Sequence, residues 1–160
     1  MKLQDTLRNS EQHLEDTEKI RVYLCGVTVY DESHIGHART IIVFDVLRKY
    51  LESKGRKIEF IQNFTDVDDK IINKANEENT TAEKISTRYI ENYFRDFDGL
   101  NVKRATNYPK ATEHIEDIVK FIEKLIGKGI AYVSKNGVYF AVTKFPEYGK
   151  LSKKKIDELQ

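Results

Sequence analysis

The chain has very little cysteine and no long apolar run, and both shortages narrow what it can be. Cys25 is the single cysteine among 160 residues, so no disulfide can form within the chain. No apolar stretch approaches the ~20 residues that a membrane-spanning helix requires. The N-terminal residues mix both charges without an apolar centre, which is unlike a secretory signal. These absences predict a soluble protein of the reducing cytoplasm, with no membrane partner.

Two common nucleotide-binding patterns are also missing. The chain contains neither G-x-G-x-x-G nor a P-loop Gly-Lys-Ser/Thr, and it has no internal repeat. Its formal net charge of +1 neither favours nor excludes a polyanionic partner. Residues 1–80 carry 12 Lys and Arg against 15 Asp and Glu, whereas residues 81–160 carry 15 against 11. This difference is either an ordinary surface imbalance or a sign that nucleic acid would contact the second half.

The spacing of apolar residues predicts a strand, a helix and a second strand early in the chain. Residues 20–25 form a β-branched and aromatic run, and apolar positions recur with a helical period across residues 37–54. Gly55 follows where helices commonly stop, and residues 57–64 return to a strand pattern. The order predicts a βαβ unit with a parallel sheet and a right-handed crossover.

Three further helices and a hairpin are predicted after the second strand, from capping boxes, apolar spacing and turn residues. They are a helix through Val67, Ile71 and Ala75 whose capping box is Thr65 and Asp68; a helix capped by Thr80 and Glu83 with Ile85, Tyr89, Tyr93 and Phe97 on one face; a helix over residues 115–126 closed by Gly127 and Gly129; and a hairpin over residues 131–142 around Asn136-Gly137.

The stretch CGVTVYDESHIGH, residues 25–37, gathers scarce residue types between the first strand and the first helix. In an open parallel sheet, ligands bind beyond the carboxyl ends of the strands, where helix N-termini offer N–H groups to phosphates. His34 and His37 could donate to phosphate oxygens there, and Gly36 would let a base or ribose approach the backbone. The simpler interpretation is that the two histidines only cap the helix. Their position directly after a strand and loop favours a nucleotide site.

Several segments of the chain resemble the cysteinyl-tRNA synthetase family of class I aminoacyl-tRNA synthetases. HIGH at residues 34–37 is similar to the first signature of that class, and YLCGVTVYD, HIGHART and NFTDVDDKIINKANE narrow the resemblance. It continues through DFDGLN, ATEHI, GKGIAYV and YGKLS, and so covers residues 20–160. The resemblance implies an α/β fold. By this resemblance the chain comprises an N-terminal arm (1–19), the first half of a Rossmann-type catalytic domain with a parallel sheet (20–98), and the beginning of a helical connective insertion with a β-hairpin (99–160).

The resemblance also implies an enzyme that joins cysteine to tRNA(Cys) through a cysteinyl-adenylate, with ATP as a substrate, Mg²⁺ and a bound zinc ion. It assigns catalysis to His34 and His37, ATP binding to His34, Gly36 and His37, cysteine binding to Gly26, Thr28 and Thr65, and zinc ligation to Cys25. Zinc binds thiolates well, so a substrate thiol could complete its coordination, whereas a serine hydroxyl would be a much poorer ligand. The alternatives are a small buried residue for Cys25 and a helix cap for Thr65.

The chain departs from the family mainly in length. The family's other three zinc ligands, its KMSKS loop and its anticodon-binding domain have no counterpart here, and KLSKK at residues 150–154 belongs to the inserted segment instead. Asp66, Asp68 and Asp69 are interpreted as acids in the first turn of a helix rather than as metal ligands. The chain therefore resembles an N-terminal portion of the enzyme and is expected to be inactive alone.

Two other functions stay open at this stage. A cysteine ligase of the mycothiol-pathway type resembles the same family and passes activated cysteine to an amino sugar, although HIGHART and TDVDDKII are closer to the synthetase. A truncated, non-catalytic paralogue that binds nucleotide or tRNA is the non-enzymatic alternative.

Overall fold

The structure is a computed structural model that describes residues 1–14 and 17–156. It divides into two compact units, one formed by Thr17–Ile115 and the other by Met1–Asp16 together with Glu116–Gln160. We call them the sheet unit and the peripheral unit. The predicted arm and insertion include positions 15–16 and 157–160, which lie outside the described residues. Among the helices of the described part, none has the length and hydropathy needed to cross a bilayer.

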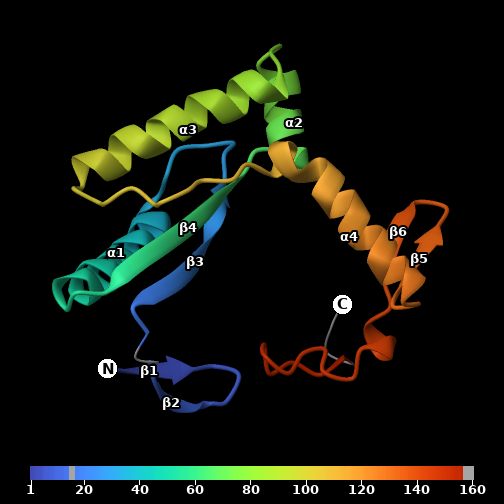
Figure 1. Cartoon of the computed structure of the whole chain (residues 1–160). Helices are drawn as coiled ribbons and strands as arrows, with labels where there is room; N and C mark the ends of the chain where they lie inside the picture. Colours follow the sequence, from blue (N-terminus) through green and yellow to red (C-terminus); the bar gives the residue numbers. More distant parts are fainter. Residues whose placement is uncertain (15–16, 157–160) are drawn as a thin grey trace. The chain divides into compact units, whose positions relative to one another are not determined.

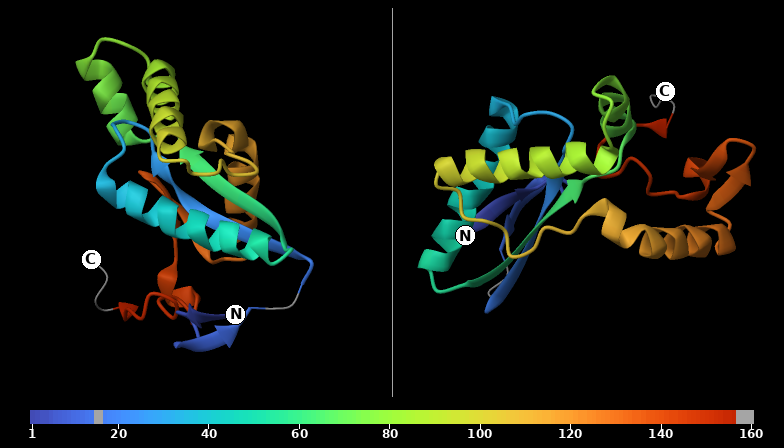
Figure 2. Two further views of the ribbon diagram at one scale, coloured as in Figure 1. Left: turned by 90° about the vertical axis from the view of Figure 1, so that its left-hand side faces the viewer. Right: turned by 90° about the horizontal axis from the view of Figure 1, so that it is seen from above.

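The sheet unit is built on two parallel strands joined by a helix (Figure 1). β3 (Lys19–Thr28) pairs in parallel with β4 (Lys57–Thr65), and α1 (Ile35–Ser53) connects them. These elements confirm the predicted βαβ unit, with each strand longer than predicted. α2 (Asp69–Glu77) and α3 (Ala82–Gly99) follow, and Figure 2 shows α1 and α3 beside the strand pair.

The core of the sheet unit lies between one face of the strands and the helices. Phe64 on β4 is 1% exposed, and its ring lies 5.1 Å from that of Tyr93 and 5.2 Å from that of Tyr108. On the same face of β4, Gln62 accepts a hydrogen bond from the Tyr93 hydroxyl at 2.8 Å. The predicted apolar face of α3 is confirmed, since all four of its members, Ile85, Tyr89, Tyr93 and Phe97, are buried.

The predicted caps of α2 and α3 are wrong, although both helices exist. Thr65 is the last residue of β4, and Asp68 caps α2 by accepting from the Lys70 N–H. Thr81, not its neighbour Thr80, caps α3. Two adjacent threonines have the same capping chemistry, so only the backbone path decides between them.

Asp66 also differs from its predicted role. Its carboxylate is buried and accepts hydrogen bonds from the backbone N–H and the hydroxyl of Thr112. Asp68 and Asp69 do lie at the start of α2, where the helix dipole favours negative charge. Asp66 instead ties the end of β4 to the chain 46 residues later.

An irregular segment completes the second edge of β4. Asn107 and Lys110 bridge β4 in parallel, and the N–H of Phe64 donates to the carbonyl of Pro109 at 2.9 Å. The compact unit therefore extends to Ile115, past residue 98, where the sequence predicts a boundary. Pro109 lacks an N–H and interrupts the strand pattern, so periodicity does not reveal this segment.

The peripheral unit contains two antiparallel hairpins. One is β1 (Lys2–Asp5) with β2 (Ser10–His13), which the sequence does not predict. The other is β5 (Ala131–Ser134) with β6 (Gly137–Phe140), as predicted, but its turn is Lys135–Asn136, one residue earlier. α4 (Ile115–Gly127) matches the predicted third helix and begins at the boundary with the sheet unit. A short 3₁₀ turn, Val142–Lys144, follows the second hairpin, and another, Ala111–His114, belongs to the sheet unit and precedes α4.

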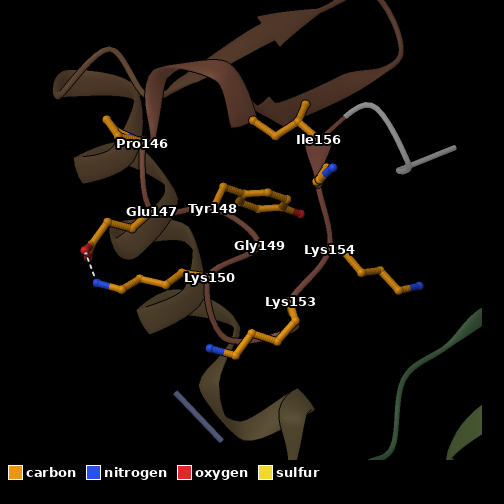
Figure 3. A pocket seen from close by; sticks show the side chains of 9 residues that line it. Pro146, Glu147, Tyr148, Gly149, Lys150, Lys153, Lys154 and Ile156 are labelled. Carbon is orange, nitrogen blue, oxygen red and sulfur yellow. Dashed lines mark hydrogen bonds and ion pairs between the residues drawn. The ribbon is translucent and has the colours of Figure 1, made fainter. Parts of the chain in front are cut away.

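A lysine-rich loop forms the C-terminal end of the described part of the peripheral unit. Residues 146–156, which we call the basic loop, surround a hollow of about 820 Å³ (Figure 3). The loop bends sharply at Gly149, whose φ is +83°; a Cβ there would lie 2.1 Å from the carbonyl oxygen of Lys154. The backbone of the loop therefore folds closely back on itself.

Candidate functional site

Two histidines form the capping box that begins α1. His34 is the N-cap residue, and its Nδ1 accepts from the N–H groups of Gly36 at 3.0 Å and His37 at 3.3 Å. The Nδ1 of His37 accepts in return from the N–H of His34 at 3.3 Å. The two rings stack with their centroids 3.7 Å apart. The capping interpretation of the pair is therefore confirmed, and the cap also fixes where both rings lie.

The cap decides which ring nitrogen carries the proton. Since Nδ1 accepts in both rings, the neutral tautomer that satisfies these bonds has its proton on Nε2. Partial burial, and secondly the neighbouring His34, lower the pKa of His37 below its ordinary value. Within the described residues, neither Nε2 has a hydrogen-bond partner. The start of α1 thus presents two N–H donors that an anion could accept from.

A close contact with His34, which the sequence does not reveal, favours glycine at position 36. A Cβ at this position would lie 2.8 Å from Cε1 of His34, closer than real contacts allow. A side chain here would push the His34 ring away from the amides that it caps. The close approach of a base or ribose remains a prediction for this glycine.

Thr28 and Thr65 meet at the carboxyl ends of the two strands. They are direct partners in the β3–β4 register, and the N–H of Val29 donates to the carbonyl of Thr65 at 3.2 Å. Their side by side placement follows from the parallel pairing that the sequence predicts. It puts both threonines at the edge of the sheet where α/β proteins bind ligands.

A β-bulge shapes β3 just before this edge. The register shifts between Leu24 and Val27, so that Cys25 and Gly26 together face one position of β4. The N–H of Gly26 donates to Oδ1 of Asn63 at 2.8 Å. A Cβ on Gly26 would lie 1.5 Å from the carbonyl oxygen of Asn63. Only glycine fits this approach, so the predicted site residue Gly26 has a steric role of its own.

Asn63 is the residue of this region that the sequence analysis missed. Its Oδ1 also accepts from the hydroxyl of Tyr23 at 2.9 Å, and its Nδ2 reaches the hydroxyl of Thr65 at 3.4 Å. One side chain therefore joins the bulge of β3 to the end of β4. The signal in the sequence was a polar residue inside the predicted strand, between Gln62 and Phe64.

Cys25 is exposed, so the interpretation of a small buried residue is wrong. Among the described residues, its Sγ makes a single weak contact, at 3.8 Å, with the carbonyl of Gly26. A thiolate at this exposed position could bind a metal ion. Within the described ranges, however, no group of three or more His, Cys, Asp or Glu side chains could hold a metal ion. The donors described here therefore do not make up a complete zinc site.

The loop before the histidines is connected to α2 and α3. Asp31 lies 3.7 Å from the ammonium of Lys74, and Glu32 accepts from the amide of Asn92 at 2.6 Å. Exposed ion pairs contribute little stability, so these contacts mainly orient the loop. They hold the chain between β3 and α1 against the helices that follow β4.

Replacing Asn63 by leucine should lower the free energy of unfolding by about 1–3 kcal/mol, because the Gly26 N–H and the Tyr23 hydroxyl would lose their shared acceptor. Asn63→Asp keeps that acceptor and should cost less. Urea unfolding of the full chain measures both, with Asn73→Leu on the exposed face of α2 as the matched control. Equal losses for Asn63→Leu and the control would contradict the role of Asn63.

The chain is similar over nearly its whole length to one part of several longer proteins. The chain matches the sequence profile described as tRNA synthetases class I (C) catalytic domain over residues 11–160. It is 53% identical over 161 residues to a cysteine--tRNA ligase of Caldicellulosiruptor saccharolyticus and 49% identical over 162 residues to one of Archaeoglobus fulgidus. These alignments cover 99% of the chain but 35% of each relative. A ligase of the same name from Thermodesulfovibrio yellowstonii is 55% identical over 146 residues, covering 89% of the chain and 30% of the relative. The chain thus spans about a third of the length of the curated relatives it matches.

A solved structure supports the fold independently. The structure of methionyl-tRNA synthetase from Mycobacterium tuberculosis in complex with methionyl-adenylate matches 72% of the chain and 23% of its own, with a TM-score of 0.66 and 16% identity. At this identity the match concerns the fold alone. It confirms the predicted α/β architecture with a parallel sheet.

Proposed function

We propose that the protein carrying this chain activates cysteine with ATP and transfers it to tRNA(Cys), because the chain belongs to the family described as tRNA synthetases class I (C) catalytic domain. The observation that supports this most directly is the pair of Nε2–H donors fixed at the start of α1. It offers the charge stabilisation that adenylate formation needs.

In the proposed reaction, an oxygen of the cysteine carboxylate attacks the α-phosphorus of ATP as the bond to pyrophosphate breaks. Negative charge grows on the phosphate oxygens during this step. His34 and His37 would donate from Nε2 to those oxygens, beside Gly36, while Mg²⁺ accompanies the triphosphate. Catalysis by positioning and charge needs rigid donors, and the stacked capping box supports rigidity.

Gly26, Thr28 and Thr65 would bind the substrate cysteine. Thr28 and Thr65 are adjacent at the strand ends, and the Gly26 bulge leads directly into them. The zinc ion implied by the resemblance would take the thiolate of Cys25 as one ligand. Since the described residues offer no complete donor set, no step is assigned to that ion.

The segment assignments remain part of the proposal: an arm over 1–19, half of a Rossmann-type catalytic domain over 20–98, and an insertion from 99 onward. A cytoplasmic location is proposed with them. The amino-sugar ligase is the second candidate, since it would use the same adenylate chemistry. The relatives named cysteine--tRNA ligase favour tRNA as the acceptor.

The full-length protein should catalyse cysteine-dependent exchange of pyrophosphate into ATP and should charge tRNA(Cys), whereas the 160-residue chain alone should not charge it. The isolated chain offers a single thiolate and about a third of the length of its relatives. Aminoacylation with radiolabelled cysteine measures both proteins.

Charging of an amino sugar instead of tRNA by the full-length protein would favour the second candidate. Absence of exchange would refute cysteine activation altogether. Charging by the isolated chain at the rate of the full-length protein would show that the required residues have been misjudged.

A further inference from the structure

We propose that Asn63 is a positioning residue, which orients the hydroxyl of Thr65 so that its proton is free to donate to a carboxylate oxygen of the bound amino acid. The identity of the substrate rests on the proposed function. The orientation of the hydroxyl rests on hydrogen bonds within the β3–β4 pair alone, which do not involve the histidines of α1.

The partners of Asn63 determine which way its side-chain amide faces. The backbone N–H of Gly26 can only donate, and its nitrogen lies 2.8 Å from the Asn63 side chain. The amide oxygen must therefore be the atom that faces Gly26. The hydroxyl of Tyr23 donates to the same oxygen at 2.9 Å. The amide nitrogen is thereby turned toward Thr65, whose hydroxyl oxygen lies 3.4 Å away.

The contact between this amide nitrogen and the hydroxyl can form in one direction only. The amide NH₂ group donates and does not accept, so the hydroxyl oxygen of Thr65 accepts. A threonine hydroxyl has one proton and two acceptor lone pairs. The contact with Asn63 occupies one lone pair and leaves the proton unused. Among the described residues, the side chain of Thr65 makes no hydrogen bond other than this one.

The unused proton lies at the edge of the sheet where a ligand is expected. Thr65 is the last residue of β4 and the register partner of Thr28, the other threonine proposed to bind cysteine. Side chains alternate along a strand and Phe64 is buried in the core, so Asn63 and Thr65 share the opposite face. The ammonium group of an amino acid can only donate, whereas its carboxylate can only accept. The carboxylate is therefore the group that the Thr65 proton complements.

Asn63→Asp is the diagnostic substitution, because aspartate keeps an oxygen toward Gly26 and replaces the amide nitrogen by a second oxygen. Thr65 would then donate its proton to that oxygen and present only lone pairs to the substrate. The full-length variant should bind cysteine about 10- to 100-fold more weakly in isothermal titration calorimetry, as expected for one lost hydrogen bond to a charged group. In pyrophosphate exchange, KM for cysteine should rise by a similar factor while KM for ATP stays unchanged. Cysteamine, which lacks the carboxylate, should not bind more weakly to the variant.

A thermodynamic cycle with Thr65→Val separates orientation of the hydroxyl from direct repulsion between the new aspartate and the substrate. Thr65→Val should itself weaken cysteine binding, and adding Asn63→Asp should then have little further effect. Additive losses would show that position 63 acts on the substrate directly, and would overturn the proposal. Thr65→Ser retains the hydroxyl and should restore the sensitivity to Asn63→Asp.

Two control variants should bind cysteine as the unaltered protein does. Tyr23→Phe removes the other side-chain partner of Asn63 and leaves its contact with Thr65 in place. Asn73→Asp makes the same chemical change at an exposed position of α2. Weakened cysteine binding by either control, equal to that of Asn63→Asp, would contradict the specific role of the contact with Thr65.

Circular dichroism of each variant verifies folding. Should Asn63→Asp fail to fold, Thr65→Val alone tests the proposal, since it must weaken the binding of cysteine and spare that of cysteamine. Normal cysteine binding by a folded Asn63→Asp variant would overturn the proposal and leave cysteine activation standing. Absence of exchange in the unaltered full-length protein would instead refute the proposed function.

Discussion

Replacing His34 or His37 by alanine in the full-length protein should slow cysteine-dependent pyrophosphate exchange by about 10²–10³-fold. This is the loss expected when one fixed donor to a developing negative charge is removed. Each ring presents one Nε2–H while its Nδ1 is engaged in the cap of α1. The substitution therefore removes a donor and a cap at once, and the two effects must be separated.

Two substitutions keep the cap and remove the imidazole. Asparagine is a favoured N-cap residue, and glutamine at the third helical position completes a capping box. His34→Asn and His37→Gln should therefore preserve the melting temperature more closely than the alanine variants, yet show a similar loss of exchange. Full exchange activity in both cap-preserving variants would show that the histidines serve only the helix.

Replacing Gly26 by alanine should cost about 3 kcal/mol or more of folding stability, at the upper end of the cost of overpacking. The added methyl group would lie 1.5 Å from a backbone carbonyl of the neighbouring strand, at Asn63. A backbone atom cannot rotate away as a side chain can, so β3 and β4 would have to separate around the bulge. Thermal or urea unfolding of the full chain measures the loss.

Gly99→Ala is the control for this change. Gly99 is the last residue of α3, and an added Cβ there meets nothing within 4 Å. The same methyl group should be neutral or stabilise the chain by up to about 1 kcal/mol, through higher helix propensity. Equal unfolding midpoints for the two alanine variants would contradict the close approach at Gly26.

Features that depend on nearby residues could be predicted from the sequence. The βαβ order follows from periodicity within each element, and the buried face of α3 follows from the four-residue spacing of Ile85, Tyr89, Tyr93 and Phe97. The histidine pair could be placed at a helix start for the same reason. Its mutual capping could not, because side-chain conformation decides which nitrogen faces which amide.

Features that join distant segments were not predictable. The Gly26 bulge requires the register between two strands, and the contact with Asn63 spans 37 residues. The segment at Asn107 and Lys110 pairs with β4 although Pro109 breaks its strand pattern. Asp66 shows the same limit, since its neighbours in sequence suggested a helix cap while its partner, Thr112, lies far along the chain.

The stacked histidines at the start of α1 have an entropic consequence for ligand binding. Immobilising a rotamer-rich side chain at a binding surface costs roughly 0.5–1.5 kcal/mol. His34 and His37 already lose this freedom when the chain folds, because each ring is bonded to the other's backbone and packed on its face. The side chains are therefore already ordered before an anion binds, and binding does not have to order them. The positive end of the helix dipole acts on that anion through the two stacked rings rather than through unpaired backbone amides.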